Sequence, residues 1–213
     1  MGGATARGCR APAFSGRMAG MRRPLAVASL LALLLPALPS ADEEIAVGLP
    51  APSFTLRAMN PEASGLAVVA LDRYVGPEAE DAQARVVLLS FFASWCEPCK
   101  KEMPYLQQLH EMYRDQGLRV LSVSIDREDP GISRARQIAA GAKVTFPVLS
   151  DRFNFLARRY LGEQSPLPSV FLVGRDGNIL RIERGYGKDA STFLLAEVQK
   201  ALGISSTTAK AVP

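Results

Sequence analysis

The sequence is poor in the residues that build metal centres. Its 213 residues include three cysteines and one histidine. A structural or catalytic metal usually takes three or four protein ligands. Cys96 and Cys99 lie close together, whereas Cys9 precedes an N-terminal signal and should be absent from the mature protein. Only His110 could join the pair, so we expect no metal and no other cofactor.

Acidic residues are missing from the first 41 positions, which hold five of the arginines. From Asp42 onward there remain 20 basic and 21 acidic residues, a formal charge of −1. The net charge of +4 therefore belongs to an N-terminal extension. The rest of the chain has no basic excess to attract the phosphates of a nucleic acid, and we expect no nucleic-acid partner.

A long hydrophobic run is also missing. The stretch PLAVASLLALLLPALP follows Arg22 and Arg23, and its apolar part, 25–35, is short for a bilayer core of about 30 Å. Small residues follow it. This pattern predicts a signal peptide cleaved near Ser40, with a retained membrane anchor as the alternative. No cysteine lies close behind for lipid attachment. We expect an extracytoplasmic protein, in the periplasm or on the outer face of the cytoplasmic membrane.

The remaining chain alternates strand and helix patterns, and we divide it into an extension (1–41), one domain (42–203) and a flexible tail (204–213). Strands are predicted within 47–60, 65–76, 85–93, 118–128, 145–151 and as a hairpin over 169–187. Helices are predicted from Cys96 to near Gly117 and over 130–141, 154–162 and 188–203. This order predicts an α/β fold with a central mixed sheet, helices on both of its faces and an N-terminal β extension.

The cysteine pair stands in SFFASWCEPCKKEMP, between a buried strand and a helix start. A structural disulfide between residues three apart would constrain the unfolded chain little, and a metal lacks ligands. Redox chemistry fits better. The positive end of a helix dipole stabilises a thiolate at Cys96, which we expect to be the exposed, attacking sulfur, whereas Cys99 would lie deeper and act second.

Neighbouring residues support this interpretation. Pro98 suits the first turn of a helix, where its missing N–H costs nothing. Trp95 either shields the pair or is an ordinary core aromatic. Glu97 should oppose an unusually stable thiolate, whereas Lys100 should favour one. We therefore expect a moderately reducing couple, roughly −220 to −280 mV.

Three segments resemble the TlpA/ResA family of thiol-disulfide oxidoreductases: GLPAPSFTL, WCEPCKKEMPYL and SPLPSVFLVGRDGNI. The resemblance spans about 47–203 and implies the thioredoxin-like fold. It also implies a cis peptide bond between Leu167 and Pro168, facing the cysteines and offering backbone to an extended substrate. The residues alone leave a trans proline equally open.

The chain departs from thioredoxins at Ser90, where they carry a buried aspartate that handles protons. Glu102 is the candidate replacement, because it lies three residues beyond Cys99 and matches a glutamate of ResA-like proteins. The alternative is a solvated Glu102 paired with a nearby lysine or arginine. The acidic segment 77–84 resembles an insertion, which we expect to be an exposed loop without an assigned function.

The resemblance implies a disulfide-containing protein substrate, with the haem-binding C-x-x-C-H segment of apocytochrome c as the nearest parallel. A membrane thiol-disulfide donor would re-reduce the cysteines. General envelope disulfide reduction and reduction of copper-site cysteines in an oxidase remain open. So does a peroxidase of the peroxiredoxin type, although Ala93 stands where that chemistry needs a hydroxyl.

A copper-delivery protein would need a ligand histidine in a distal loop, whereas His110 falls in the first helix as an ordinary surface residue. A non-catalytic binding module is the last alternative.

Overall fold

The structure, a computed structural model, describes residues 45–162, 166–185 and 190–204. The predicted extension and all but the first residue of the predicted tail lie outside these ranges, so the domain boundaries stay a prediction. Ile204, the first residue of that tail, packs against the core and donates its backbone N–H to the Gln199 carbonyl at 2.9 Å.

A mixed five-stranded sheet forms the centre of the domain, as predicted, in the order β5-β4-β3-β6-β7. Its strands are β3 (Val86–Phe92), β4 (Leu118–Ser124), β5 (Val148–Ser150), β6 (Ser169–Gly174) and β7 (Ile179–Arg184). Strands β3, β4 and β5 run parallel, whereas β6 is antiparallel to β3 and to β7. The hairpin turns at Gly177, whose φ of 86° is the positive value that its Asp-Gly sequence favours.

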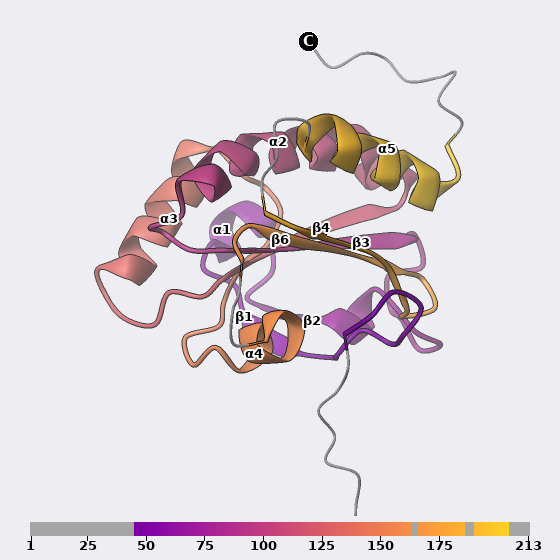
Figure 1. Cartoon of the computed structure of the whole chain (residues 1–213), viewed down its shortest axis with the longest axis horizontal. Coiled ribbons are helices and arrows are strands. Elements are labelled where there is room, and N and C mark those ends of the chain that lie inside the picture. The colour runs from indigo at the N-terminus through magenta and orange to yellow at the C-terminus, as the bar shows by residue number, and fades with distance from the viewer. Residues whose placement is uncertain (1–44, 163–165, 186–189, 205–213) are drawn as a thin grey trace, which may run out of the picture. The chain divides into compact units, whose positions relative to one another are not determined.

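Helices cover both faces of this sheet (Figure 1). They are α2 (Glu97–Tyr113), α3 (Gly131–Gly141), α4 (Phe155–Leu161) and α5 (Ala190–Leu202). Helices α2, α3 and α5 lie on one face, and α4 lies on the other, beside the short strands β1 (Thr55–Arg57) and β2 (Val68–Ala70). Every predicted helix is present, with its ends moved by a few residues.

Strand β3 separates two hydrophobic cores because both of its faces are buried. Val86, Leu88 and Phe92 point toward the core beneath α2, α3 and α5. Val87, Leu89 and Phe91 point toward the core on the α4 side. This two-sided burial explains the continuous apolar run in the sequence, which is typical of central strands in α/β proteins.

The N-terminal β extension is a two-stranded antiparallel sheet, in which Leu56 pairs with Val69. An isolated bridge between Ala58 and Leu149 attaches it to the outer edge of β5. Between its strands lies a four-residue helix, α1 (Pro61–Ser64), which the periodicity of the sequence does not predict.

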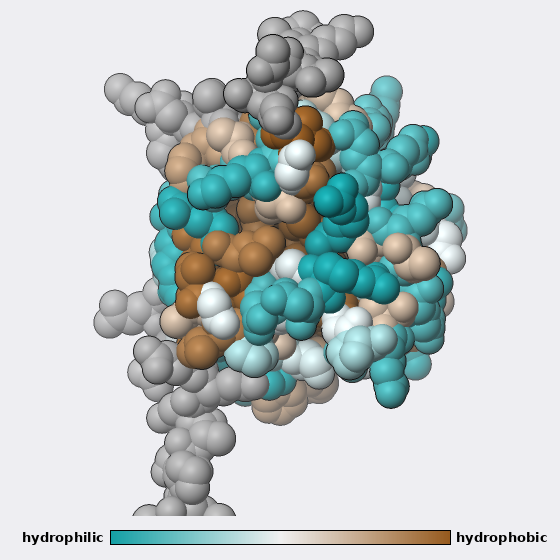
Figure 2. Space-filling model, turned by 90° about the vertical axis from the view of Figure 1, so that its right-hand side faces the viewer, coloured by the Kyte–Doolittle hydropathy of each residue, from teal (hydrophilic) through white to brown (hydrophobic). Residues whose placement is uncertain are grey.

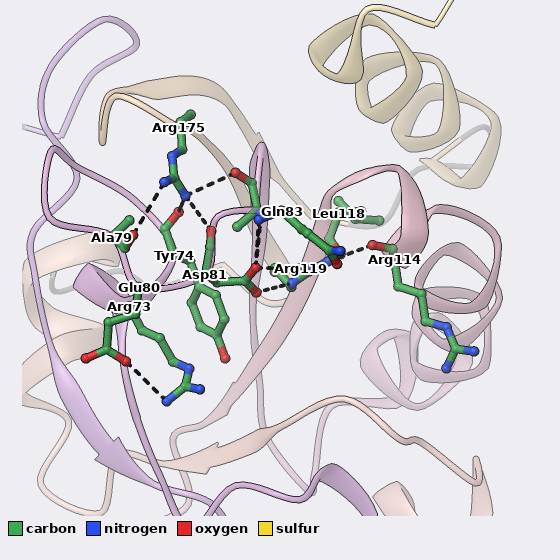
Figure 3. A network of polar contacts seen from close by, with 11 residues as sticks. Arg73, Tyr74, Ala79, Glu80, Asp81, Gln83, Arg114, Leu118, Arg119 and Arg175 are labelled. Carbon is green, nitrogen blue, oxygen red and sulfur yellow. Dashed lines mark hydrogen bonds and ion pairs between the residues drawn. The ribbon is translucent and has the colours of Figure 1, made fainter.

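The acidic segment 77–84 is fastened to the sheet, so the expectation of a simple exposed loop is wrong in part (Figure 3). Its Asp81 accepts two hydrogen bonds from Arg119 on β4, at 2.6 and 3.2 Å. Arg175, beyond β6, donates to the carbonyl of Asp81 at 2.6 Å and to that of Ala84 at 3.2 Å. Ala84 is buried, although most of the segment's other side chains are exposed.

The surface carries both hydrophobic and hydrophilic side chains. On the side shown in Figure 2, hydrophobic atoms gather in a patch that hydrophilic side chains border. Within the described ranges, none of the helices combines the length and the apolar character that crossing a membrane requires.

Candidate active site

The two cysteines form a disulfide at the start of helix α2, with a Cα–Cα distance of 5.3 Å. Cys96 is the N-cap residue, and its sulfur accepts the backbone N–H of Cys99 at 3.3 Å. Cys96 therefore lies at the positive end of the helix dipole, as predicted. Cys96 is 4% exposed and Cys99 is 1% exposed. The expectation of an exposed outer sulfur is thus wrong for the oxidised form, although Cys99 does lie deeper.

The first turn of α2 contains three of the residues singled out from the sequence. Pro98 is the second residue of the helix and is exposed. Lys100 forms an ion pair with Glu97. The two charges were expected to act in opposite directions on the Cys96 thiolate. Because they pair with each other at a solvent-exposed position, they have little net effect on it.

Glu102 lies one turn beyond Cys99 and is buried, so the solvated alternative is wrong. The Ser90 hydroxyl donates to Glu102 Oε2 at 3.0 Å, and the residue is 5% exposed. Burial raises the pKa of Glu102 to about 7, and the hydrogen bond from Ser90 offsets part of that increase. A carboxyl with this pKa exchanges protons readily near neutral pH.

Asp126, which no motif of the sequence indicates, holds the loop that leads to the cysteines. Its Oδ2 accepts the backbone N–H of Ser94 at 2.9 Å, and its Oδ1 accepts the Ser94 hydroxyl at 2.8 Å. The Ser124 hydroxyl also donates to Oδ2 at 2.8 Å. A Cβ at Gly131 would lie 2.8 Å from Oδ1, so any larger residue at this position would collide with the carboxylate. The only local signal is an acidic residue two positions after a buried strand.

The peptide bond between Leu167 and Pro168 is cis, as the family resemblance implied. Leu167 packs against the hydrophobic cluster that contains both cysteines. The carbonyl of Pro168 accepts the backbone N–H of Gly185 at 2.8 Å. Within the described residues the backbone of Leu167 makes no hydrogen bond, which leaves it as the group that could pair with an extended substrate. A second cis bond, between Asp129 and Pro130, was not predicted.

Trp95 precedes Cys96 and is 68% exposed, so it is not a core aromatic. Its ring instead forms part of the surface beside the disulfide. The structure thus brings together Trp95, both cysteines and Leu167-Pro168 at the carboxyl end of β3, with Glu102 buried beneath.

His110 lies near the far end of α2, about 21 Å from Cys96 by the helix rise. It is half-buried, with its ring 5.8 Å from that of Phe146, so it is not an ordinary surface residue. Burial and the charge of Arg114 lower the pKa of His110. Within the described residues no three His, Cys, Asp or Glu side chains are grouped to hold a metal ion.

Residues 47–182 match the AhpC/TSA family. ResA of Geobacillus kaustophilus, a thiol-disulfide oxidoreductase, is 30% identical over 141 residues, which cover 66% of this chain and 71% of that protein. ResA of Bacillus subtilis is 29% identical over 143 residues, 67% of this chain and 70% of its own length. The crystal structure of a thiol:disulfide interchange protein, DsbE, from Chlorobium tepidum aligns with a TM-score of 0.62 at 28% identity, over 75% of this chain and all of that one.

Proposed function

Because the chain belongs to the AhpC/TSA family and is a thiol-disulfide oxidoreductase of the ResA and DsbE type, we propose that it reduces disulfides of exported proteins. The proposed substrate is the C-x-x-C-H segment of apocytochrome c, whose thiols must be free before haem is attached. The observation that supports thiol-disulfide exchange at this site most directly is the buried Glu102, one turn beyond Cys99, with a pKa near neutral pH.

The reaction begins with the reduced protein. The thiolate of Cys96, stabilised at the start of α2, attacks one sulfur of the substrate disulfide. The substrate S–S bond breaks, a mixed disulfide forms with Cys96, and the other substrate sulfur leaves as a thiolate. The exposed ring of Trp95 and the free backbone of Leu167 would hold the substrate chain alongside.

Cys99 completes the exchange. Glu102 takes the proton of Cys99 through water, and the resulting thiolate attacks Cys96 Sγ. The mixed disulfide breaks, the second substrate sulfur leaves, and the disulfide between Cys96 and Cys99 forms. Two electrons pass from the protein to the substrate. A membrane thiol-disulfide carrier then returns two electrons, since the proposed extracytoplasmic location separates the protein from cytosolic reductants.

A Cys99→Ala variant tests the substrate assignment. Without its resolving thiol, the variant should accumulate mixed disulfides through Cys96, and mass spectrometry of the envelope fraction should identify apocytochrome c in them. A Cys96→Ala variant is the control and should trap nothing. Trapped partners that exclude apocytochrome c would leave general disulfide reduction or copper-site reduction as the function.

Equilibration with glutathione buffers tests the direction of electron flow. A potential of roughly −220 to −280 mV supports a reductase, and one above about −180 mV would make the protein an oxidase or isomerase. Consumption of peroxide would instead favour the peroxidase alternative, for which Ala93, a buried residue, offers no hydroxyl.

A further inference from the structure

The loops that follow β3, β4 and β5 meet at one edge of the sheet. Phe92 is in register with Ser124, and Ser124 with Ser150. Cys96 therefore shares this edge with the residues just after β5. Two strand spacings of about 4.8 Å separate β3 from β5, so the loop after β5 begins roughly 10 Å from the end of β3, which leads into Cys96.

Two adjoining cavities open beside that loop, with volumes of about 470 and 270 Å³. Both are lined by Arg152 and Phe153. The larger one adds apolar side chains from β1 and α4, among them Leu56 and Phe155. Phe153 and Phe155 are 68% and 65% exposed, which is unusual for large aromatic residues. We call these two cavities together the arginine groove.

Arginines without carboxylate partners surround the groove. Within the described residues, no ion pair includes Arg57, Arg127, Arg152 or Arg158, although each lines one of the two cavities. Arg158 instead lies over the ring of Phe155, with its guanidinium carbon 5.0 Å from the ring centre. The groove therefore offers guanidinium groups beside exposed aromatic rings.

The carboxylates in the groove do not neutralise these arginines. Asp151 is buried, and its oxygens accept the backbone N–H groups of Phe155 at 3.0 Å and Ala157 at 2.7 Å. Glu128 is exposed at the rim of the smaller cavity. Four arginines thus face one exposed carboxylate, in a domain whose formal charge is −1 from Asp42 onward.

We propose that the arginine groove binds a segment of the protein substrate that carries aspartate or glutamate together with an apolar side chain, a few residues from the disulfide being reduced. This inference rests on the proposed function and narrows its substrate class. Arginine pairs with carboxylates through two parallel hydrogen bonds, and the phenylalanine rings offer apolar contact. Because an extended residue spans about 3.3 Å, a separation of about 10 Å places the acidic segment at least about three residues from the reacting cysteine. This proximity to Cys96 favours a substrate chain over a lipid headgroup.

Three disulfide peptides test the proposal. They share one disulfide loop and one phenylalanine, and differ in the flanking residues, which are glutamate, glutamine or lysine. The full-length protein, reduced beforehand, should reduce the glutamate peptide about fivefold faster than the glutamine peptide at low salt, and the lysine peptide slowest. The differences should shrink below about twofold at 0.5 M salt, where charges are screened.

A charge reversal in the groove should invert this order. The double variant Arg152→Glu, Arg158→Glu should prefer the lysine peptide. The matched control is Arg134→Glu, Arg136→Glu, which changes the same charge on exposed residues of α3 and should keep the original preference. Phe153→Ser should slow the glutamate and lysine peptides by a similar factor, because it removes only the apolar contact. Unchanged reduction of glutathione disulfide shows that each variant is folded.

The outcomes separate this inference from the function that it assumes. Equal rates for all three peptides in the wild type would overturn the groove proposal and leave disulfide reduction intact. Failure to reduce any peptide or glutathione disulfide would overturn the proposed function itself. Binding to phosphatidylglycerol vesicles that requires the groove arginines, together with no peptide preference, would assign the groove to anionic lipid and also overturn the proposal.

Discussion

In the proposed reaction, the residue that exchanges protons with Cys99 is Glu102, which belongs to helix α2 and not to strand β3. Ser90 occupies the strand position, and its hydroxyl donates to Glu102 at 3.0 Å. One neutral hydrogen bond stabilises the carboxylate less than burial destabilises it, so the pKa of Glu102 is raised to about 7. Near neutral pH both protonation states are populated, which suits a group that must accept a proton from Cys99 and later return it.

The first prediction concerns this carboxyl. Glu102→Gln should remove an inflection near pH 7 from the pH dependence of mixed-disulfide resolution, and should lower the rate at pH 7 by about tenfold or more. Ser90→Ala removes the hydrogen bond that lowers the pKa of Glu102, so its inflection should move to higher pH. Rapid-quench measurement of resolution checks both variants. An inflection that persists in Glu102→Gln would belong to another group.

The second prediction compares two buried aspartates at the same edge of the sheet. Asp126→Asn replaces one acceptor oxygen with an amide that cannot accept from Ser94, so the loop before Cys96 should lose its fixed position. Asp151→Asn makes the same change at the start of α4. Each should cost about 1–3 kcal/mol of stability.

Only one of these two variants should alter the chemistry. In the reduced protein, the pH at which Cys96 becomes reactive toward iodoacetamide should rise in Asp126→Asn and stay unchanged in Asp151→Asn. Equal behaviour of the two variants would give Asp126 a purely structural role.

At the scale of secondary structure, helices and strands could be predicted wherever a short stretch of sequence has a pattern typical of one conformation. The two-sided apolar run of β3, the helical spacing in α2 and the Asp-Gly turn of the β6–β7 hairpin each specify their own conformation. The contacts that anchor loops were not predictable in this way. Ser94 and Asp126 are 32 positions apart, and Arg175 reaches carbonyls about 90 positions away. Only the folded sheet brings such partners together.

The third prediction concerns the fastened segment 77–84. Asp81→Asn should lower the free energy of unfolding by about 1–2 kcal/mol, because it removes a charge-assisted pair with Arg119 that is largely shielded from solvent. Arg119 lies at the beginning of β4, about 23 Å along the strand direction from Asp126. Disulfide reduction should therefore be unaffected. Urea unfolding and a reductase assay on one sample check both statements. A loss of activity as large as that of Cys99→Ala would contradict the expectation that Asp81 acts on stability alone.

At the scale of the whole domain, the sheet separates the candidate active site from the Asp81 network. The cysteines, the cis bond at Pro168 and the arginine groove lie at the carboxyl end of β3 and its parallel neighbours. The Asp81 network lies at the opposite end, where β4 begins and β6 ends. A change in the Asp81 network and a change at the cysteine end should therefore have additive effects on stability, as separated sites usually do.

The last prediction concerns the stability of the whole domain as a function of pH. Glu102 has a folded pKa of about 7 against an ordinary value of 4.5, so between these values the folded state holds a proton that the unfolded state has lost. Stability should then fall as pH rises through this window, by up to about 3 kcal/mol, and level off above pH 7. His110 acts in the opposite sense, because its lowered pKa makes stability rise with pH up to about 6.5. Urea unfolding of oxidised wild type and Glu102→Gln at pH 5 and pH 8 separates the two, since His110 is common to both proteins. The wild type should lose more stability than the variant between these pH values, and equal losses would mean that Glu102 titrates normally in the folded state.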